Sequence, residues 1–218
     1  MKRQSKTETA RAYRINGSSR RYSRQLPEVR RAAIVQAAIR CLDKGGASHL
    51  TTTSVMNEAK VSRGLVNHYF PSMSDLLVEA YAAMIDGLSD KALGDMRRQS
   101  GSAGLKLRAM VDVAFGPLIF EHPNNQAWLE VWPIMTTEVK LRQVHTRSYR
   151  KYRRELVTVL KRLASERGRK INATRLATAT IALVDGLWLN WSIDPQLFKG
   201  KEARRACFDM LEAHLGPI

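Results

Sequence analysis

The sequence predicts an all-α protein of about nine helices in 218 residues. From Pro27 onward, apolar residues recur three and four positions apart, which is the period of an amphipathic helix. We find no segment with the alternation of apolar and polar residues that a half-buried strand requires. Because 44% of the residues are hydrophobic, the chain has enough apolar surface to form a folded core, and wholesale disorder is excluded.

The N-terminal helices are bounded by residues that start or stop a helix. The Gly45-Gly46 pair should end the first helix. Pro71 should stop the third, because proline has no amide hydrogen to donate. Ser74 is the expected N-cap of a long fourth helix. The helices expected in this half are 27–44, 52–59, 63–70 and 75–98.

The remainder of the chain follows the same helical period. A stretch rich in Gly and Ser at 100–104 marks the clearest internal break. Gly116-Pro117 and Pro133 should kink or shorten the two helices that contain them. The helices expected in this half are 105–121, 124–136, 138–167, 172–193 and 201–214.

The net charge of +16 is concentrated in two basic blocks, residues 1–31 and residues 138–175. A field of one sign attracts nucleic acid or an anionic membrane, and charge alone does not distinguish them. Residues 1–26 lack apolar periodicity and form a flexible basic arm, which is either solvated or follows DNA phosphates. The second block is either a DNA surface or the solvated face of a long helix, which its interleaved apolar residues favour.

Composition excludes several classes of protein. No run of 18 apolar residues is present, and residues 1–26 lack the apolar segment of a signal peptide, so we expect no membrane contact. Cys41 and Cys207 lack the spacing of a metal site or a disulfide framework, which fits a reducing cytoplasm. His122 and His145 are isolated, with surface or packing roles. Without an enzyme motif, we expect no catalytic residue, no metal and no cofactor.

The two short helices, with the few residues between them, have the pattern of a helix-turn-helix. Ala59 is small enough for the helices to cross closely, and Ser62 is a good N-cap for the second helix. Arg63, Asn67 and His68 then lie on the exposed side, where they can reach base edges or phosphates. The alternative is a pair of surface helices that packs on the first helix without nucleic acid.

The same region resembles the DNA-binding signature of the tetracycline-repressor (TetR) family, through VSRG, HYF and DLL within residues 30–80. The resemblance implies a homodimeric, ligand-responsive repressor whose second motif helix enters the major groove of a double-stranded DNA operator. After the basic arm (1–26), it implies a helix-turn-helix DNA-binding domain (27–73) and an effector-binding and dimerisation domain (74–218). The residues that it implies for DNA contact are Thr52, Thr53, Ser62, Arg63, Gly64, Asn67, His68 and Tyr69, and Lys60 in the turn is a further candidate.

Two positions depart from the family pattern. Lys60 stands in the turn where the family usually has glycine, so the turn is strained or adjusted, although a lysine there can also reach a phosphate. Met73 stands where many members have a basic residue before the fourth helix, which puts that phosphate contact in doubt. The basic arm is the segment that can compensate.

The four tryptophans form two pairs. Trp128 and Trp132 share one helix face, and Trp188 and Trp191 lie on a second helix. Asp185 lies in an apolar run beside the second pair, where an unpaired carboxylate is costly. Aromatic faces with a carboxylate suit a quaternary ammonium ion, which is a cation without hydrogen-bond donors. The alternative is that the tryptophans are core residues and that Asp185 pairs with an arginine.

A second resemblance favours the ligand site. The stretches AWLEVW and VDGLWL, from Ala127 and from Val184, are similar to the BetI subgroup of the TetR family, the choline-responsive repressors of glycine-betaine synthesis. It implies choline or a similar amine as effector. The residues that it implies for ligand binding are Trp128, Trp132, Asp185 and Trp188. The arm is longer than this subgroup leads us to expect, so a regulator with another small apolar or cationic effector stays open.

The family resemblance places the dimer surface on the last two helices. Ala173, Ala177 and Thr180 would permit close packing there, or would equally face the core of one subunit. We expect a cytoplasmic dimer on a near-palindromic operator. A different class also stays open, namely a non-specific nucleic-acid-binding protein that acts through the two basic blocks and lacks preference for an operator over random DNA.

Overall fold

The structure is a computed structural model that describes residues 27–116, 120 and 126–218. These residues contain helices and no strands, which confirms the all-α class. The predicted arm at 1–26 lies outside the described residues. The helices of the described part are α1 (Pro27–His49), α2 (Thr52–Ala59), α3 (Arg63–Tyr69), α4 (Met73–Arg98), α5 (Ala103–Ala114), α7 (Gln126–Ile134), α8 (Val139–Glu166), α9 (Ala173–Ile193) and α10 (Gly200–Leu215).

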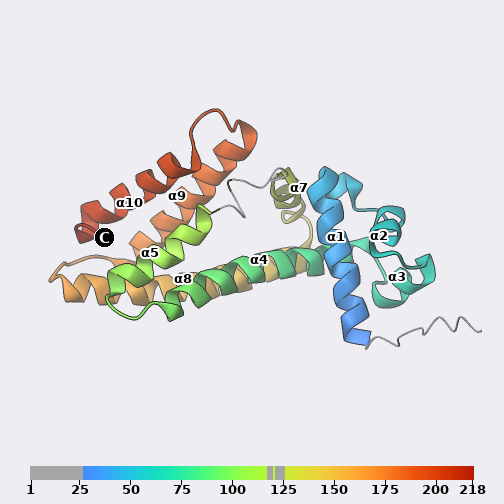
Figure 1. Cartoon of the computed structure of the whole chain (residues 1–218), viewed down its shortest axis with the longest axis horizontal. Helices are drawn as coiled ribbons and strands as arrows, with labels where there is room; N and C mark the ends of the chain where they lie inside the picture. The colour runs from blue at the N-terminus through green and yellow to red at the C-terminus, as the bar shows by residue number, and fades with distance from the viewer. Residues whose placement is uncertain (1–26, 117–119, 121–125) are drawn as a thin grey trace, which may run out of the picture.

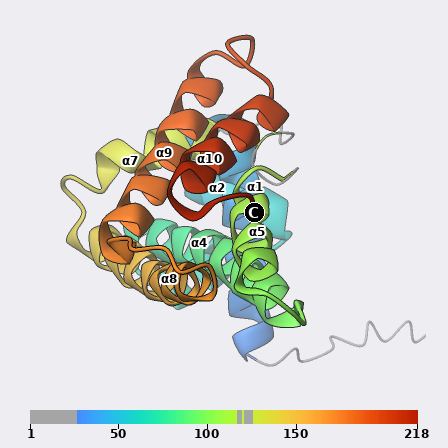
Figure 2. The ribbon, with the colours of Figure 1, turned by 90° about the vertical axis from the view of Figure 1, so that its left-hand side faces the viewer.

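The helices form two groups joined by long elements. α1, α2 and α3 gather at one end, and α4 runs from them along the molecule beside α8 (Figure 1). α5 packs on α4 and α8, while α9 packs on α8 and α10 (Figure 2). α7 contacts α1 on one side and α9 on the other. The two ends are therefore connected through α4, α7 and α8.

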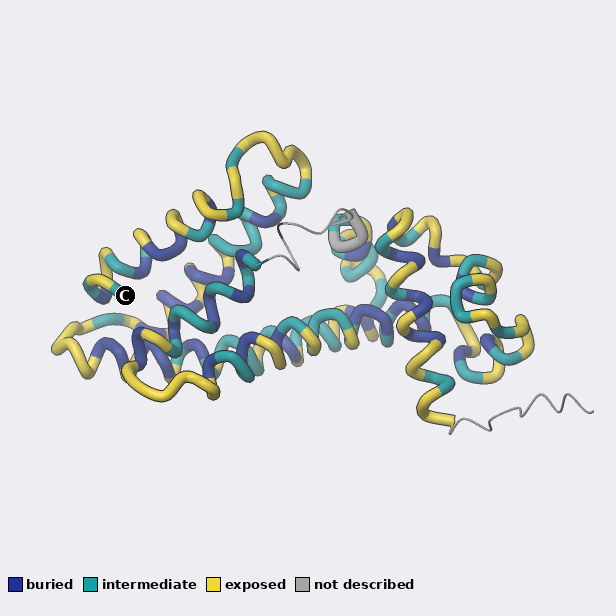
Figure 3. Tube along the Cα trace, in the orientation of Figure 1, coloured by how far each residue is buried: buried dark blue, intermediate teal, exposed yellow. Residues whose placement is uncertain are grey.

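Buried residues form two clusters, and α4 contributes its first part to one and its last part to the other (dark segments in Figure 3). The N-terminal cluster joins α1, α2, α3 and the first part of α4 with Val131 of α7 and Leu141 of α8. The C-terminal cluster joins the end of α4 with α5, α8, α9 and α10. Cys41 and Cys207 are free thiols buried in these clusters. Because α4 contributes to both clusters, a shift of this helix is felt at both ends.

The start of α4 differs from the prediction. The helix begins at Met73, and its N-cap is Ser72, so the assignment of Ser74 as N-cap is wrong. Ser72 Oγ accepts the Asp75 N–H at 3.1 Å and donates to the Asp75 carboxylate at 2.8 Å, a reciprocal arrangement like that of a capping box. Ser74 lies inside the helix and donates instead to Glu138 at 2.6 Å.

Glycine and proline bend or end helices near the predicted positions. α1 leaves helical geometry at Gly45 and Gly46 and then resumes, so the predicted stop is a kink. α5 ends at Ala114, well before the predicted limit of 121 and two residues before the Gly116-Pro117 pair. α7 ends one residue after Pro133. These helix ends follow from the backbone freedom of glycine and the missing donor of proline.

The second basic block is partly neutralised by α4. Three bases of α8 pair with three carboxylates of α4: Lys140–Asp75 at 2.6 Å, Arg147–Asp86 at 3.4 Å and Lys151–Asp90 at 2.7 Å. Exposed pairs of this kind contribute roughly 0–1 kcal/mol each, so their main effect is on the register of the two helices. These pairs neutralise part of the charge of the second basic block without nucleic acid. They therefore favour the interpretation of this block as the solvated face of a helix over that of a DNA surface.

α9 is long and apolar enough, by length and composition alone, to cross a membrane. Its inner face packs on α8 and α10 and includes Ala173, Ala177 and Thr180, all buried within the subunit. Of the two roles open to these small residues, the structure supports the core of one subunit. Ala182 and Ile193 lie on the opposite, exposed face, and Ile193 is 68% exposed. The inner apolar face of α9 therefore packs in the core of the subunit. Its outer apolar face stays exposed and can contact another protein surface.

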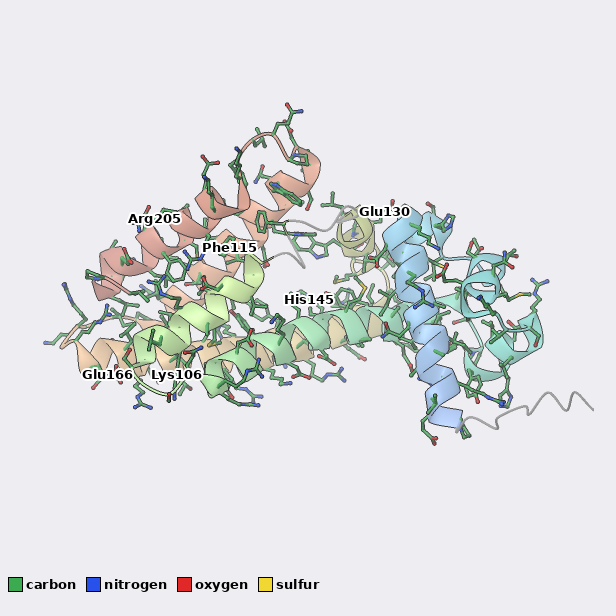
Figure 4. All side chains as sticks on the ribbon, in the orientation of Figure 1. Lys106, Phe115, Glu130, His145, Glu166 and Arg205 are labelled. Atoms are coloured by element: carbon green, nitrogen blue, oxygen red, sulfur yellow. The ribbon has the colours of Figure 1, made fainter. Side chains whose placement is uncertain are left out.

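The contact between α7 and α1 centres on Glu130, which Figure 4 labels beside α1. Its carboxylate accepts the backbone N–H groups of Ala47 and Ser48, directly after the kink. Gly46 has φ 66° and ψ −162°, a region of backbone space that is essentially restricted to glycine. A Cβ at this position would overlap the Glu130 carboxylate. The kink and the carboxylate fit together only because residue 46 is a glycine.

We expect Gly46→Ala to destabilise the folded protein by about 1–3 kcal/mol, since the backbone is strained for alanine and the new methyl displaces Glu130. Gly87→Ala is the matched control, because a Cβ there meets no atom within 4 Å. In the interior of α4 this alanine should stabilise the protein by roughly 0.5–1 kcal/mol. Urea denaturation followed by circular dichroism measures both effects. Equal midpoints for the two variants would contradict the close fit at the kink.

Candidate nucleic-acid interface and ligand cavity

α2 and α3 form a helix-turn-helix on the outer side of α1. Ser62 is the N-cap of α3, as predicted, and its Oγ accepts the Leu65 N–H at 3.3 Å. Val55 of α2 and Val66 of α3 are buried in the N-terminal cluster. Helices of this length are marginal in isolation, so the packing of α2 on α1 and of α3 on α2 holds them in place. Packing fixes the inner face of α3 and leaves its outer face and first turn exposed.

The turn between α2 and α3 contains the strain predicted at Lys60. This residue has φ 55° and ψ 45°, and within the described part of the chain no other non-glycine residue has positive φ. The left-handed conformation costs a side-chain-bearing residue roughly 1–2 kcal/mol. It allows the Lys60 N–H to donate to the Met56 carbonyl and to end α2. The exposed lysine side chain is thereby fixed next to the start of α3.

The residues predicted to contact DNA gather on the outer face of this motif. Arg40 and Lys44 of α1 are occupied by Glu58, whereas neither Lys60 nor Arg63 forms an ion pair with a described acidic residue. Thr52 and Tyr69 are partly buried, and the fully exposed members are Thr53, Lys60, Ser62, Arg63, Gly64, Asn67 and His68. The cations of the motif that lack a partner are therefore those beside α3.

Gly64 and Met73 have clear structural settings. A Cβ at Gly64 would meet no atom within 4 Å, so the packing of the subunit does not require glycine at this exposed position. A glycine there leaves room for another backbone to approach the first turn of α3. Met73 packs against the N-terminal cluster, which gives this position a role in the core in place of a phosphate contact.

A cavity lies among α4, α5, α7, α8 and α9 in two adjoining parts. The part of about 120 Å³, here the aromatic lobe, includes Tyr81, Trp132 and Trp188. The part of about 150 Å³, here the apolar lobe, includes Met110, Val111 and Ile181. The residues that line both lobes are Ile85, Leu88, Ala114, His145, Val184 and Asp185. Because the lobes share these walls, one ligand can occupy both.

The structure brings together three of the four residues predicted to bind ligand. The rings of Trp132 on α7 and Trp188 on α9 lie 5.4 Å apart between centroids, with 56° between their planes. Asp185 lies on the wall common to both lobes. Trp128 belongs to α7, but its side chain lies outside the described residues. Trp191 takes a separate position, with its ring 5.0 Å from that of Phe120.

Asp185 carries an uncompensated carboxyl group. Burial raises its pKa from 3.8 to about 6. None of the described lysine or arginine side chains forms an ion pair with it, so the pairing with arginine that the sequence left open is not observed there. Burial raises the pKa values of Tyr81 and Tyr152 well above their usual range; the Asp185 charge adds to this at Tyr81, and the Cys207 and Asp185 charges add to it at Tyr152. The carboxyl group thus lies near two phenols and lacks a fixed cation.

Sequence reasoning missed several polar residues of the cavity. His145, which we expected to have a surface or packing role, lines both lobes and lies beside α4 (Figure 4). Its Nδ1 is 2.8 Å from the Tyr81 hydroxyl, its ring is 6.1 Å from that of Tyr149, and burial lowers its pKa. The spacing of His145, Tyr149 and Tyr152 on one face of α8 is the signal that points to a shared wall.

Comparisons with known proteins agree with both sites. Residues 34–80 match the model of bacterial regulatory proteins of the tetR family, and residues 104–216 match the C-terminal domain of BetI-type transcriptional repressors. The HTH-type transcriptional regulator BetI of Burkholderia thailandensis is 29% identical over 191 residues, which is 87% of this chain and 95% of that protein. The corresponding regulator of Vibrio parahaemolyticus is 27% identical, with 87% and 94% covered.

Solved structures share the fold. A putative transcriptional regulator from Pseudomonas aeruginosa has a TM-score of 0.77 and 30% identity, with 90% of this chain and 95% of that chain covered. A putative transcriptional regulator from Saccharomonospora viridis, in complex with choline, has a TM-score of 0.73 and 21% identity, with 85% and 96% covered. The arrangement of helices described above is thus that of known transcriptional regulators.

We expect Asp185→Asn to stabilise the ligand-free protein at pH 8 by about 1–3 kcal/mol. The folded state holds the Asp185 proton up to pH about 6, whereas the unfolded chain releases it near 3.8. The stabilising contribution is therefore present at low pH and is lost as the pH rises through about 6. Thermal unfolding at pH 4 and pH 8 should show the gain only at pH 8. Glu155→Gln on α8 is the control, and a similar gain there would contradict a specific cost at Asp185.

Proposed function

We propose a specific role for this chain, which belongs to the TetR family of transcriptional regulators and has the C-terminal domain of a BetI-type repressor. In this role, a dimer represses transcription by binding a near-palindromic operator, and choline or a related quaternary amine controls the binding. The genes under its control are those of choline and glycine-betaine metabolism.

The observation that carries the proposal is the cavity formed by Asp185, Trp132 and Trp188. A quaternary ammonium ion has a positive charge and no N–H group, so it needs a carboxylate and aromatic faces rather than hydrogen-bond acceptors. Asp185 supplies the charge without a competing cation among the described residues, and the two indole rings supply the faces. Support also comes from the BetI names of the relatives and from the choline held by the regulator of Saccharomonospora viridis.

The proposed DNA contact uses α3 as the helix that enters the major groove. Arg63, Asn67 and His68 provide donors and acceptors for base edges, while the first turn of α3 and Lys60 face phosphates. Dimerisation through the exposed faces of α9 and α10 would place two such helices on one side of DNA. Half-sites one helical turn apart require a separation on the order of 34 Å.

Ligand control of this kind requires a link between the cavity and α3. Trp132 lies on α7, and Glu130 of the same helix holds the kink of α1; α2 packs on α1, and α3 packs on α2. A ligand shifts the balance between two orientations only by its different affinity for them. In the proposed mechanism, the amine binds more tightly when α7 is placed so that the two α3 helices no longer match the operator.

Two other functions remain as alternatives to this proposal. One is control of a different pathway by another small apolar or cationic effector, which would use the same cavity. The other is non-specific binding of nucleic acid in the cytoplasm, for which the pairing of the second basic block with α4 leaves less free charge. Competition by random DNA separates the specific repressor from a non-specific binder, and choline affinity separates the proposed effector from another one.

We expect Asn67→Ala to weaken operator binding by about 5-fold to 100-fold with the fold intact, because one base contact contributes roughly 1–3 kcal/mol of discrimination. The operator is first selected from random duplexes with the unaltered protein, and affinities are measured by fluorescence anisotropy at fixed salt. Gln143→Ala, at an exposed position of α8, is the control. If random DNA competes as well as the operator does, the chain is a non-specific binder and the proposal fails.

We expect choline to bind more weakly at low pH, because Asp185 must be ionised and its pKa is about 6. Calorimetry at pH 8 and pH 5 should show affinity falling by roughly tenfold, since about one tenth of the carboxyl groups remain ionised one unit below the pKa. Asp185→Asn should bind weakly at both values, whereas Glu155→Gln should behave like the unaltered protein. Equal affinity of Asp185→Asn and the unaltered protein for choline would reject the site.

A further inference from the structure

The apolar lobe indicates more about the effector than its charge. We propose that the cavity accommodates an ammonium ion with an apolar substituent larger than the hydroxyethyl group of choline, with the cation in the aromatic lobe and the substituent in the apolar lobe. This inference rests on the proposed function, because it uses the same carboxylate for the same cation. It adds a second subsite and a class of ligand, the alkyl ammonium ions.

The first argument is the position of Asp185 between the lobes. It lines the aromatic lobe together with Trp132 and Trp188, and it lines the apolar lobe together with Ile181 and Met110. A cation that lies against this carboxylate and the two indole rings therefore has the apolar lobe directly beside it. A substituent on the nitrogen can enter that lobe without moving the charge away from Asp185.

The second argument is volume. The apolar lobe measures about 150 Å³, and an apolar cavity of that size in another protein stays free of water and holds benzene. Choline fills only the space around its own charge, so the apolar lobe would stay empty beside it. Atoms that line an empty space lack dispersion contacts, and an alkyl substituent restores them.

The third argument is that three hydroxyl groups of the apolar lobe, those of Ser148, Tyr152 and Thr180, already have partners. Ser148 donates its O–H to Asp86, and Thr180 donates to the Leu176 carbonyl at 2.8 Å. Tyr152 donates to the Met110 carbonyl at 3.3 Å. Each of these side chains has a single O–H, which is therefore not free for a ligand. A polar substituent would lose water without gaining these donors, whereas an alkyl chain loses nothing.

The fourth argument is the adaptability of the lining. Met110 lies at the wall of the lobe, and its unbranched thioether side chain adjusts to irregular shapes more easily than branched residues do. The other apolar side chains of the wall come from three helices, α4, α5 and α9. The lobe therefore favours apolar substituents by size, with limited demand on their shape.

The test is a series of ligands that share one headgroup. Affinities for tetramethylammonium, choline, butyltrimethylammonium and hexyltrimethylammonium are measured by calorimetry at pH 8 with the full chain. We expect affinity to rise by up to about fourfold for each methylene that enters the lobe and then to level off when the lobe is full. Bromide salts of each ligand keep the counter-ion constant.

Variants that fill the lobe locate the alkyl chain. Ile181→Phe and Val111→Phe each add volume to the apolar lobe at residues that do not line the aromatic lobe. In either variant the ratio of hexyltrimethylammonium affinity to choline affinity should fall towards one. Two variants are used because one of them can fail to fold, and the other then still gives the affinity ratio. Circular dichroism shows whether each variant is folded.

The outcomes distinguish this inference from the proposed function. Rising affinity along the series, together with a collapsed ratio in the filled variants, supports it. Equal affinity for choline and the longer ions overturns the alkyl subsite and leaves the choline-responsive repressor in place. An undiminished preference for hexyltrimethylammonium in both folded variants also overturns it, because the chain then lies elsewhere. Absence of binding by every ammonium ion overturns the inference and the proposed effector together.

Discussion

The contact of Glu130 with the kink of α1 is the hydrogen-bonded link between the helix that lines the cavity and the helix on which α2 packs. α7 is a short helix, yet it carries Trp132 in the wall of the cavity and Glu130 at the backbone of residues 47 and 48. The left-handed glycine at position 46 makes this approach possible. Since α2 packs on α1 and α3 packs on α2, the helix-turn-helix is linked to α7 by this hydrogen-bonded carboxylate and by the buried Val131 of α7.

Under the proposed function, the cavity is a binding site that is maintained at the expense of stability. Burial raises the pKa of Asp185 to about 6, so the carboxyl group is mostly ionised at neutral pH. The ionised group has lost its hydration without gaining a cation, and this lowers the free energy of unfolding. A quaternary amine would supply that cation and recover the loss as binding free energy. A ligand that binds the folded protein in this way raises its free energy of unfolding and favours the arrangement of α7, α8 and α9 that binds the ligand.

The sequence predicted what depends on local pattern. Helix periods, the Ser62 cap and the strain at Lys60 are set by residues close in the chain, and the structure agrees; at Gly45-Gly46 the predicted helix end is a kink inside α1. Ser74 was misjudged because two serines compete for one cap, and Asp75 decides between them. The Tyr81–His145 pair and the partners of Glu130 join residues far apart in sequence, and periodicity contains no information on which helix faces which. Resemblance and chemistry together predicted Asp185, Trp132 and Trp188 as one ligand site, and these residues line one cavity, whereas the apolar lobe needed the structure.

Under the proposed function, the location of the cavity explains how a small cation acts on DNA binding. Asp185 and Trp188 lie on α9, whose outer face, with Ala182 and Ile193, is free for a second subunit. Trp132 lies on α7, which holds α1. A ligand between Asp185 and Trp132 therefore bridges the helix that faces the partner subunit and the helix that positions α3. The spacing of the two α3 helices depends on the angle between those elements, so the cavity lies where a small change of angle has the largest effect on operator fit.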